Sequence, residues 1–210
     1  MTGSPAAEPD WAAYRQEAFG DPYLVWHDGP DFAEFRERFA ADPDLATRML
    51  RAGIAEGDAL AAQTPRELTL TDQQRAVFVD LLTAALPAAE AGVRLEAGAS
   101  LYVLTGDPTW SAPVAEVLGS GLFWGVRIDA AIRLAAFPPT ADLVAVLALG
   151  VRDPEYLVRY HSANTLLRWA GRTEEVSDDE ELFGLLVDGV GPEGWAVVAG
   201  RLAAGVPLPL

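Results

Sequence analysis

The sequence has no cysteine, no lysine and only two histidines. The absence of cysteine excludes disulfides and thiolate metal sites. All fifteen positive charges are therefore arginines, and alanine and glycine are abundant, which is typical of a GC-rich bacterial genome. Phosphate-binding loops, Ser/His/Asp arrangements and His–Glu metal motifs are also missing. The sequence thus predicts a protein that is not an enzyme and that carries no metal and no cofactor.

Positive charge is scarce as well. The chain has 31 acidic against 15 basic residues, a net charge of −16. Nucleic acid is an unfavourable partner for such a chain because phosphate contacts need a cationic surface. A basic protein partner fits this charge, although acidity also serves solubility alone. The first ten residues lack a positively charged and an apolar segment, and the longest apolar run, "LVAVLALGV" at 143–151, is too short to span a bilayer. We expect a cytoplasmic protein with no membrane contact.

Strand-like alternation is almost absent, and helix-start signals recur along the chain. An Asp or Thr precedes apolar residues at helical spacing, often with Pro next or Glu/Gln three residues on. Such signals occur at Asp31 with Glu34, Asp42-Pro43, Thr71 with Gln74, Asp107-Pro108, Asp153-Pro154 and Ser177 with Glu180. Residues 1–9 are expected to be disordered, and a short helix is expected from Asp10 to Phe19. The apolar run Tyr23–Trp26 is consistent with either a short strand or a buried irregular segment.

Three segments align without gaps: "VRLEAGASLYVLTG" from 93, "VRIDAAIRLAAFPP" from 126 and "VRYHSANTLLRWAG" from 158. We call them the matching segments. They start 33 and 32 residues apart, and each has Val-Arg first and Leu at its ninth position. Offsets 0, 4, 8 and 11 carry apolar or small residues, which lie along one face of an α-helix. Leu101, Leu134 and Leu166 are therefore expected at equivalent buried positions.

The matching segments resemble the second helices of HEAT-like repeats, the short bacterial form in particular. In that family an Asp often precedes Val-Arg, as in "DPEYLVR" at 153–159, whereas "PAAEAGVR" and "SGLFWGVR" depart from the pattern. The resemblance covers about residues 72–205. It implies an all-α fold, a right-handed α-solenoid of antiparallel helix pairs. We expect one helical-repeat domain over 10–210, with irregular helices over 10–71. The alternative is an ordinary helical bundle whose amphipathic helices look alike.

In stacked helix pairs, the second helices line one curved face. Offsets 3 and 7 of the matching segments would form a polar ridge on this face, flanked by aromatic residues. Aromatic and Arg side chains on such a face are typical partner anchors. The candidate partner-binding residues are Glu96, Tyr102, Trp124, Asp129, Arg133, Tyr160, His161 and Thr165. The alternative for each residue is a solvated helix face.

His161 occupies the slot that Glu96 and Asp129 fill in the other matching segments, so we expect it to be polar and exposed rather than catalytic. His27, next to Asp28, is interpreted as a turn residue. An acidic patch in a stretch without basic residues is the second candidate site, and it either attracts a basic partner or only solubilises the chain. Its residues are Glu174, Glu175, Asp178, Asp179, Glu180 and Glu181.

The leading functional hypothesis is a non-enzymatic protein-binding repeat protein. It would be a scaffold, an adaptor or an inhibitor, including an immunity-type protein that neutralises a basic toxin or nuclease. The alternative is a HEAT-like DNA glycosylase for alkylated bases, with Asp129, Trp124 and Tyr160 in its site. The net charge disfavours this alternative because such an enzyme needs many phosphate contacts.

Overall fold

A computed structural model describes residues 10–187 and 191–208. Within these residues the chain forms thirteen α-helices and four short 3-10 helices and no strand, so the fold is all-α as the sequence predicts. The predicted disorder of residues 1–9 lies outside the described residues. Contacts divide the chain into two compact units, Met1–Leu104 and Thr105–Leu210. This division does not coincide with the boundary at 71/72 that the sequence suggests, and the single domain expected over 10–210 stays a prediction.

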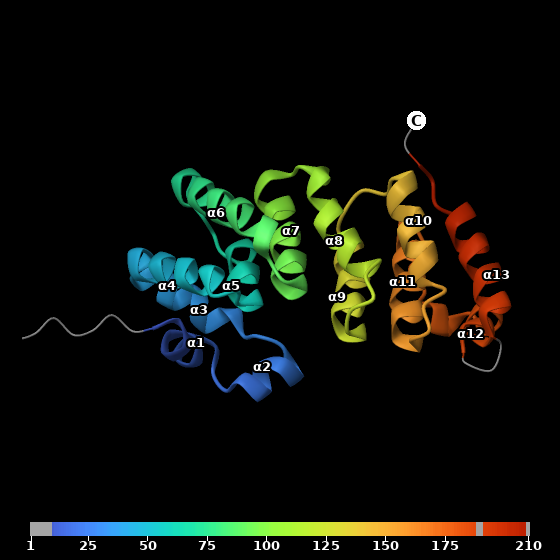
Figure 1. The fold of residues 1–210 in the computed structure, drawn as a ribbon, viewed down its shortest axis with the longest axis horizontal. Helices are drawn as coiled ribbons and strands as arrows, with labels where there is room; N and C mark the ends of the chain where they lie inside the picture. Colours follow the sequence, from blue (N-terminus) through green and yellow to red (C-terminus); the bar gives the residue numbers. More distant parts are fainter. Residues whose placement is uncertain (1–9, 188–190, 209–210) are drawn as a thin grey trace, which may run out of the picture. The chain divides into compact units, whose positions relative to one another are not determined.

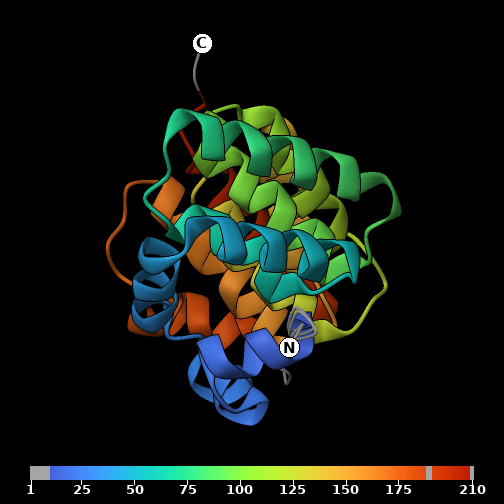
Figure 2. The same ribbon diagram turned by 90° about the vertical axis from the view of Figure 1, so that its left-hand side faces the viewer.

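Unit 1 consists of short helices followed by two longer ones. Aromatic rings pack inside it: Phe19 stacks on Phe35 with 4.9 Å between ring centroids, and Tyr14 meets Phe35 edge-on. Figure 2 shows α4 and α6 side by side, in agreement with their contacts. The helices of this unit are α1 (Trp11–Phe19), α2 (Pro22–Asp28), α3 (Phe32–Ala41), α4 (Pro43–Ala55), α5 (Ala59–Gln63), α6 (Asp72–Ala85) and α7 (Ala91–Thr105), with η1 (Thr64–Glu67) and η2 (Leu86–Ala88) between them.

Most of the predicted helix starts are present. The Asp31 and Asp42 side chains accept hydrogen bonds from the backbone N–H groups of their first turns, and Thr71 with Gln74 forms a complete capping box. The start predicted at Asp153-Pro154 was wrong, because α11 (Tyr156–Trp169) begins two residues after this proline. Two further expectations were wrong. Tyr23–Trp26 belongs to helix α2, because Asp21 caps a helix that starts at Pro22. His27 is accordingly in the last turn of α2, and its Nδ1 lies 2.7 Å from the Asp28 carboxylate.

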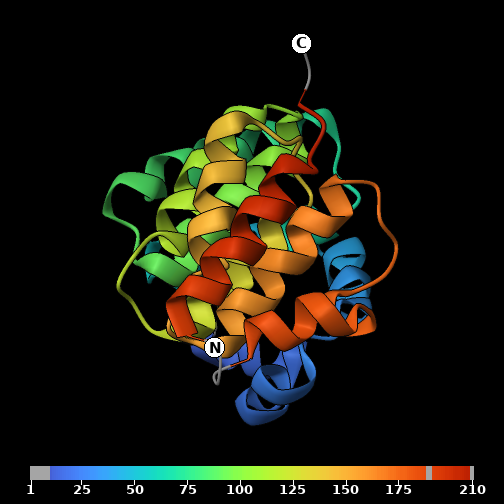
Figure 3. The same cartoon turned by 90° about the vertical axis from the view of Figure 1, so that its right-hand side faces the viewer.

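Unit 2 contains two antiparallel helix pairs, α8/α9 and α10/α11, each joined by a short loop (Figure 1). The first helices α8 and α10 contact each other, and the second helices α9 and α11 pack together closely. Helix α13 packs against α10 and α11, and α12 packs against α13 (Figure 3). The helices are α8 (Ser111–Leu118), α9 (Trp124–Leu134), α10 (Ala141–Gly150), α11 (Tyr156–Trp169), α12 (Glu180–Leu186) and α13 (Gly191–Ala204), with η3 (Pro108–Trp110) and η4 (Val176–Asp178).

The matching segments form α7, α9 and α11. Leu101, Leu134 and Leu166 are all fully buried, as their shared position predicts. Small residues also allow close packing within the second pair, because a Cβ on Gly150 would lie 2.3 Å from the Ser162 Oγ. The apolar stripe therefore faces the core in all three helices.

The Val-Arg arginines share a contact that the sequence did not predict. Arg94, Arg127 and Arg159 each donate to the backbone carbonyl five residues earlier, at 3.1, 3.0 and 2.8 Å. Each arginine thus fastens the loop that leads into its own helix. Arg127 also pairs with Asp153, which precedes the next matching segment, so one Asp–Arg rung forms although the segment of Arg127 has no Asp of its own. These side chains are structural and are not offered to a partner.

Candidate functional site

Glu96 lies at offset 3 of the first matching segment, where we expected an exposed polar ridge. The structure contradicts this expectation, because Glu96 is only 7% exposed. Its Oε2 lies 2.5 Å from Nη1 of Arg66, whose side chain is also 7% exposed. Arg66 comes from η1, thirty residues earlier in the chain. The Glu96 carboxylate is therefore one half of a buried ion pair in unit 1.

Thr165 lies at offset 7 and is also buried, at 3% exposure. Its hydroxyl donates to the Ala131 carbonyl of α9 at 2.8 Å. The equivalent residue Ser100 in α7 is fully buried and donates to the Ala62 carbonyl at 2.7 Å. Offset 7 therefore faces an adjacent helix in both units, and the expectation that Thr165 lines an exposed ridge was wrong.

The remaining candidates fall into two groups. Tyr102 is half-buried on α7, in unit 1. Five candidates share the α9/α11 pair of unit 2, and they are Trp124, Asp129, Arg133, Tyr160 and His161. Asp129 is exposed, Arg133 is half-buried, and Trp124 is 41% exposed with its ring centroid 4.9 Å from that of Phe123.

The acidic patch contacts the exposed surface of the α9/α11 pair at Tyr160. The Tyr160 hydroxyl donates to the Glu175 carboxylate at 2.5 Å and lies 3.2 Å from the Ser177 Oγ. Val176 is fully buried, and its backbone N–H donates to Oδ1 of Asn164 on α11 at 2.8 Å. The segment around η4 is therefore fixed against the exposed side of α11. The lone valine within the acidic run is the sequence signal for this packing, which was not predicted.

His161 follows Tyr160 in α11, and two carboxylates act on it electrostatically. Its ring meets the Tyr160 ring edge-on, with 5.2 Å between centroids. Burial lowers the pKa of His161 below its ordinary value, while the charges of Glu175 and Asp129 act in the opposite direction. The His161 side chain is half-buried, so the expectation that it would be exposed was wrong. We call Asp129, Tyr160, His161 and Glu175 the acidic face.

The other residues of the acidic patch serve the local structure. The Asp178 carboxylate accepts from the Glu175 backbone N–H at 3.0 Å in a capping box, and Asp179 caps α12 by accepting from the Leu182 N–H at 3.1 Å. The predicted Ser177–Glu180 capping box was therefore wrong. Ser177 lies inside η4, and α12 starts at Glu180, two residues after η4 ends. Glu181 pairs with Arg201 at 2.5 Å. Glu180 lies exposed in the first turn of α12, where its charge favours the helix dipole.

Glu174 lies exposed, 3.5 Å from Arg172 Nε. Backbone hydrogen bonds and the Arg172 charge lower the pKa of Glu174, so this carboxylate stays ionised. Glu175 directly precedes the buried Val176 and is the acid of the patch whose side chain reaches α11.

No family model, no curated protein and no solved structure matches this chain. Within residues 10–187 and 191–208, no three His, Cys, Asp or Glu residues gather as metal ligands would. Over the same residues, every helix is too short or too polar to cross a bilayer.

Proposed function

We propose that the chain is a non-enzymatic helical-repeat protein that binds another protein. The proposed architecture is a right-handed α-solenoid of HEAT-like pairs. Two observations support it: like helices of α8/α9 and α10/α11 pack together, and three arginines at one repeat position make the same loop contact. Composition favours the cytoplasm of a bacterium as its setting.

The acidic face is the proposed partner site. The observation that carries this proposal is the Tyr160–Glu175 hydrogen bond, because it joins the surface of α11 to the acidic patch. The Tyr160 and His161 rings meet here, and the charges of Glu175 and Asp129 both act on His161. Such a site suits an Arg or Lys side chain, which can stack on a ring and pair with an acid. The proposed partner is therefore a basic protein, and inhibition of a toxin or nuclease is one form of this function.

The same geometry disfavours the glycosylase alternative. Asp129 is exposed on α9, as a catalytic carboxylate would be, but the second carboxylate of Glu175 acts on the same neighbour, His161. A DNA phosphate would meet like charge at this point. A base-excision assay on alkylated DNA tests this alternative directly, and activity that is lost in Asp129→Asn would replace our proposal.

Affinity capture of basic proteins from the native lysate tests the proposed function. We expect a protein partner to be retained at about 0.1 M salt and released at about 1 M salt, where the Debye length falls to about 3 Å. The double variant Asp129→Asn with Glu175→Gln should weaken binding about tenfold or more, because it removes both charges of the face.

A matched control removes the same charge elsewhere. Glu37 and Asp80 are exposed on α3 and α6. The double variant Glu37→Gln with Asp80→Asn should bind as the original chain does. If both double variants weaken capture equally, only net charge matters and the acidic face is not the site.

A further inference from the structure

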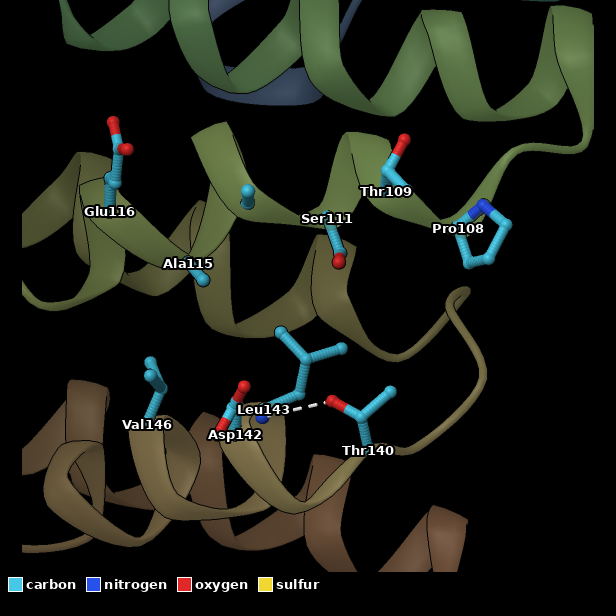
Figure 4. A pocket seen from close by; sticks show the side chains of 10 residues that line it. Pro108, Thr109, Ser111, Ala115, Glu116, Thr140, Asp142, Leu143 and Val146 are labelled. Carbon is cyan, nitrogen blue, oxygen red and sulfur yellow. Dashed lines mark hydrogen bonds between the residues drawn. The ribbon is translucent and has the colours of Figure 1, made fainter. Parts of the chain in front are cut away.

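A groove runs between the first helices α8 and α10, on residues that do not belong to the acidic face (Figure 4). Its volume is about 610 Å³, within the range of about 300–1,000 Å³ that is usual for binding sites. Leu143 and Val146 of α10 point towards Ala115 and Ser111 of α8 (Figure 4). The floor is therefore apolar and open to solvent.

The apolar surface continues along α10. Val146 and Leu149 are three residues apart and hence on the same side of the helix. Leu149 is 64% exposed, an unusual environment for a large apolar side chain unless something covers it. Helix α8 has eight residues and is about 12 Å long, so the groove accommodates about two turns of a third helix.

Charge defines what this groove can accept. Its lining includes two acids, Glu116 at the end of α8 and Asp142 in the first turn of α10, and no arginine. The full charge of Asp142 exceeds the partial positive charge of about half a unit at the helix N-terminus. A second copy of this chain would bring a net charge of −16 to an acidic groove, so self-association is disfavoured.

We propose that the α8–α10 groove docks an amphipathic, cationic helix of another protein. Two apolar side chains one turn apart would cover Ala115, Leu143 and Val146, and a third would reach Leu149. Arg or Lys side chains beside the apolar stripe would face Glu116 and Asp142. Unit 2 thus offers a second binding surface, separate in its residues from the acidic face, and this inference does not depend on the acidic face being a binding site.

Two synthetic peptides of about 14 residues test the proposal, a length at which an isolated helix is marginally stable. Both carry leucines at i, i+4 and i+7, one with arginine and the other with glutamate at the flanking positions. Fluorescence anisotropy measures binding to the full chain, and amide NMR shifts map it. We expect the arginine peptide to bind at micromolar concentrations, to shift amides of α8 and α10, and to bind more weakly at about 1 M salt. The glutamate peptide should not bind.

Ala115→Arg places a long side chain on the half-exposed floor of the α8–α10 groove and should weaken binding of the arginine peptide at least tenfold. Asp142 is exposed, so Asp142→Asn should leave the fold intact and weaken binding of the arginine peptide about threefold. Asp80→Asn on α6 is the matched control and should not change binding. Equal binding by Ala115→Arg at unchanged helical content, or equal affinity for the glutamate peptide, would overturn the proposal. So would a dimer of this chain that Ala115→Arg dissociates, because the occupant would then be a second copy.

Discussion

Helices α7 and α9 carry the same sequence pattern in two different surroundings. Each buries the leucine at its ninth pattern position, Leu101 or Leu134, and each uses its arginine to hold the preceding loop. They differ at offset 3. Glu96 of α7 is buried against Arg66, whereas Asp129 of α9 is exposed. One pattern therefore gives a core ion pair in unit 1 and a surface carboxylate in unit 2.

The difference shows which features of a helical pattern are determined by the helix's own sequence. Apolar spacing alone determines which side of a helix faces the core. The environment of a polar position depends on what packs over it, and that neighbour comes from elsewhere in the chain. Arg66 lies in a 3-10 turn that no feature of the matching segment indicates.

The largest expected contrast is between Glu96 and Asp129. Glu96→Ala removes the nearer of the two carboxylates beside the buried Arg66 guanidinium, while Glu67 stays 3.5 Å from its Nε, and should lower the free energy of unfolding by about 3 kcal/mol. Asp129→Ala should change it by less than about 0.5 kcal/mol, because the side chain is exposed. Urea unfolding of both variants measures the two values. Similar losses would mean that the two positions do not differ in burial as described.

The two leucines should respond alike where the two acids differ. Leu101→Ala and Leu134→Ala each remove a fully buried side chain and should each lower stability by about 2–5 kcal/mol. Leu24→Ala, at an exposed leucine of α2, is the control and should have an effect below about 0.5 kcal/mol. Thermal and urea unfolding test this. A neutral Leu134→Ala would show that the stripe of α9 faces away from the core.

Offset 7 gives a smaller contrast between buried and exposed hydroxyls. Ser100→Ala and Thr165→Val each remove the donor to a buried carbonyl and should lower stability by about 1–3 kcal/mol. Thr69→Val, at an exposed threonine, should be close to neutral. If all three substitutions prove equal, the two hydroxyls do not act as helix-to-helix contacts.

The smallest effect concerns His161, which occupies offset 3 in the third matching segment with intermediate burial. Its pKa in the folded state is lowered by burial, so the unfolded chain binds the proton more readily. The free energy of unfolding should therefore fall as the pH drops below about 6.5, the ordinary histidine value, and His161→Gln should reduce this fall. NMR titration, with His27→Gln to assign the signals, measures the pKa directly.

Substitution of the neighbouring acids sharpens this last test. Asp129→Asn or Glu175→Gln removes a charge that favours the protonated imidazole, so each should lower the pKa of His161 further. A rise of this pKa in either variant would show that the carboxylates do not act on the ring.

Sequence patterns predicted much of the fold. Caps at Asp31, Asp42 and Thr71 and the stripe of the matching segments give the all-α class and several helix starts. Helix α2 was not predicted. Its four central residues, considered without the residue that caps the helix, favour a strand and a helix about equally. The start of α12 was displaced because Glu175, rather than Ser177, caps the preceding turn.

Less of the candidate site was accessible from the sequence. Asp129 and Tyr160 were identified, but Glu96 and Thr165 were assigned to the surface although each contacts a group thirty or more residues away. The junction of Tyr160 with Glu175 spans fifteen residues and depends on how the segment after α11 folds back. Such contacts between segments leave no periodic signal in the sequence.

Helix α13 has a consequence for how the C-terminal end of unit 2 is held together. It lays Val198, Ala199 and Leu202 against the last helix pair, and the Trp195 ring stacks on the buried Arg159 guanidinium with 4.0 Å from ring centroid to Cζ. Because the Arg159 guanidinium also donates to the Leu186 carbonyl at the end of α12, this one side chain of the third matching segment holds both of the last two helices in place.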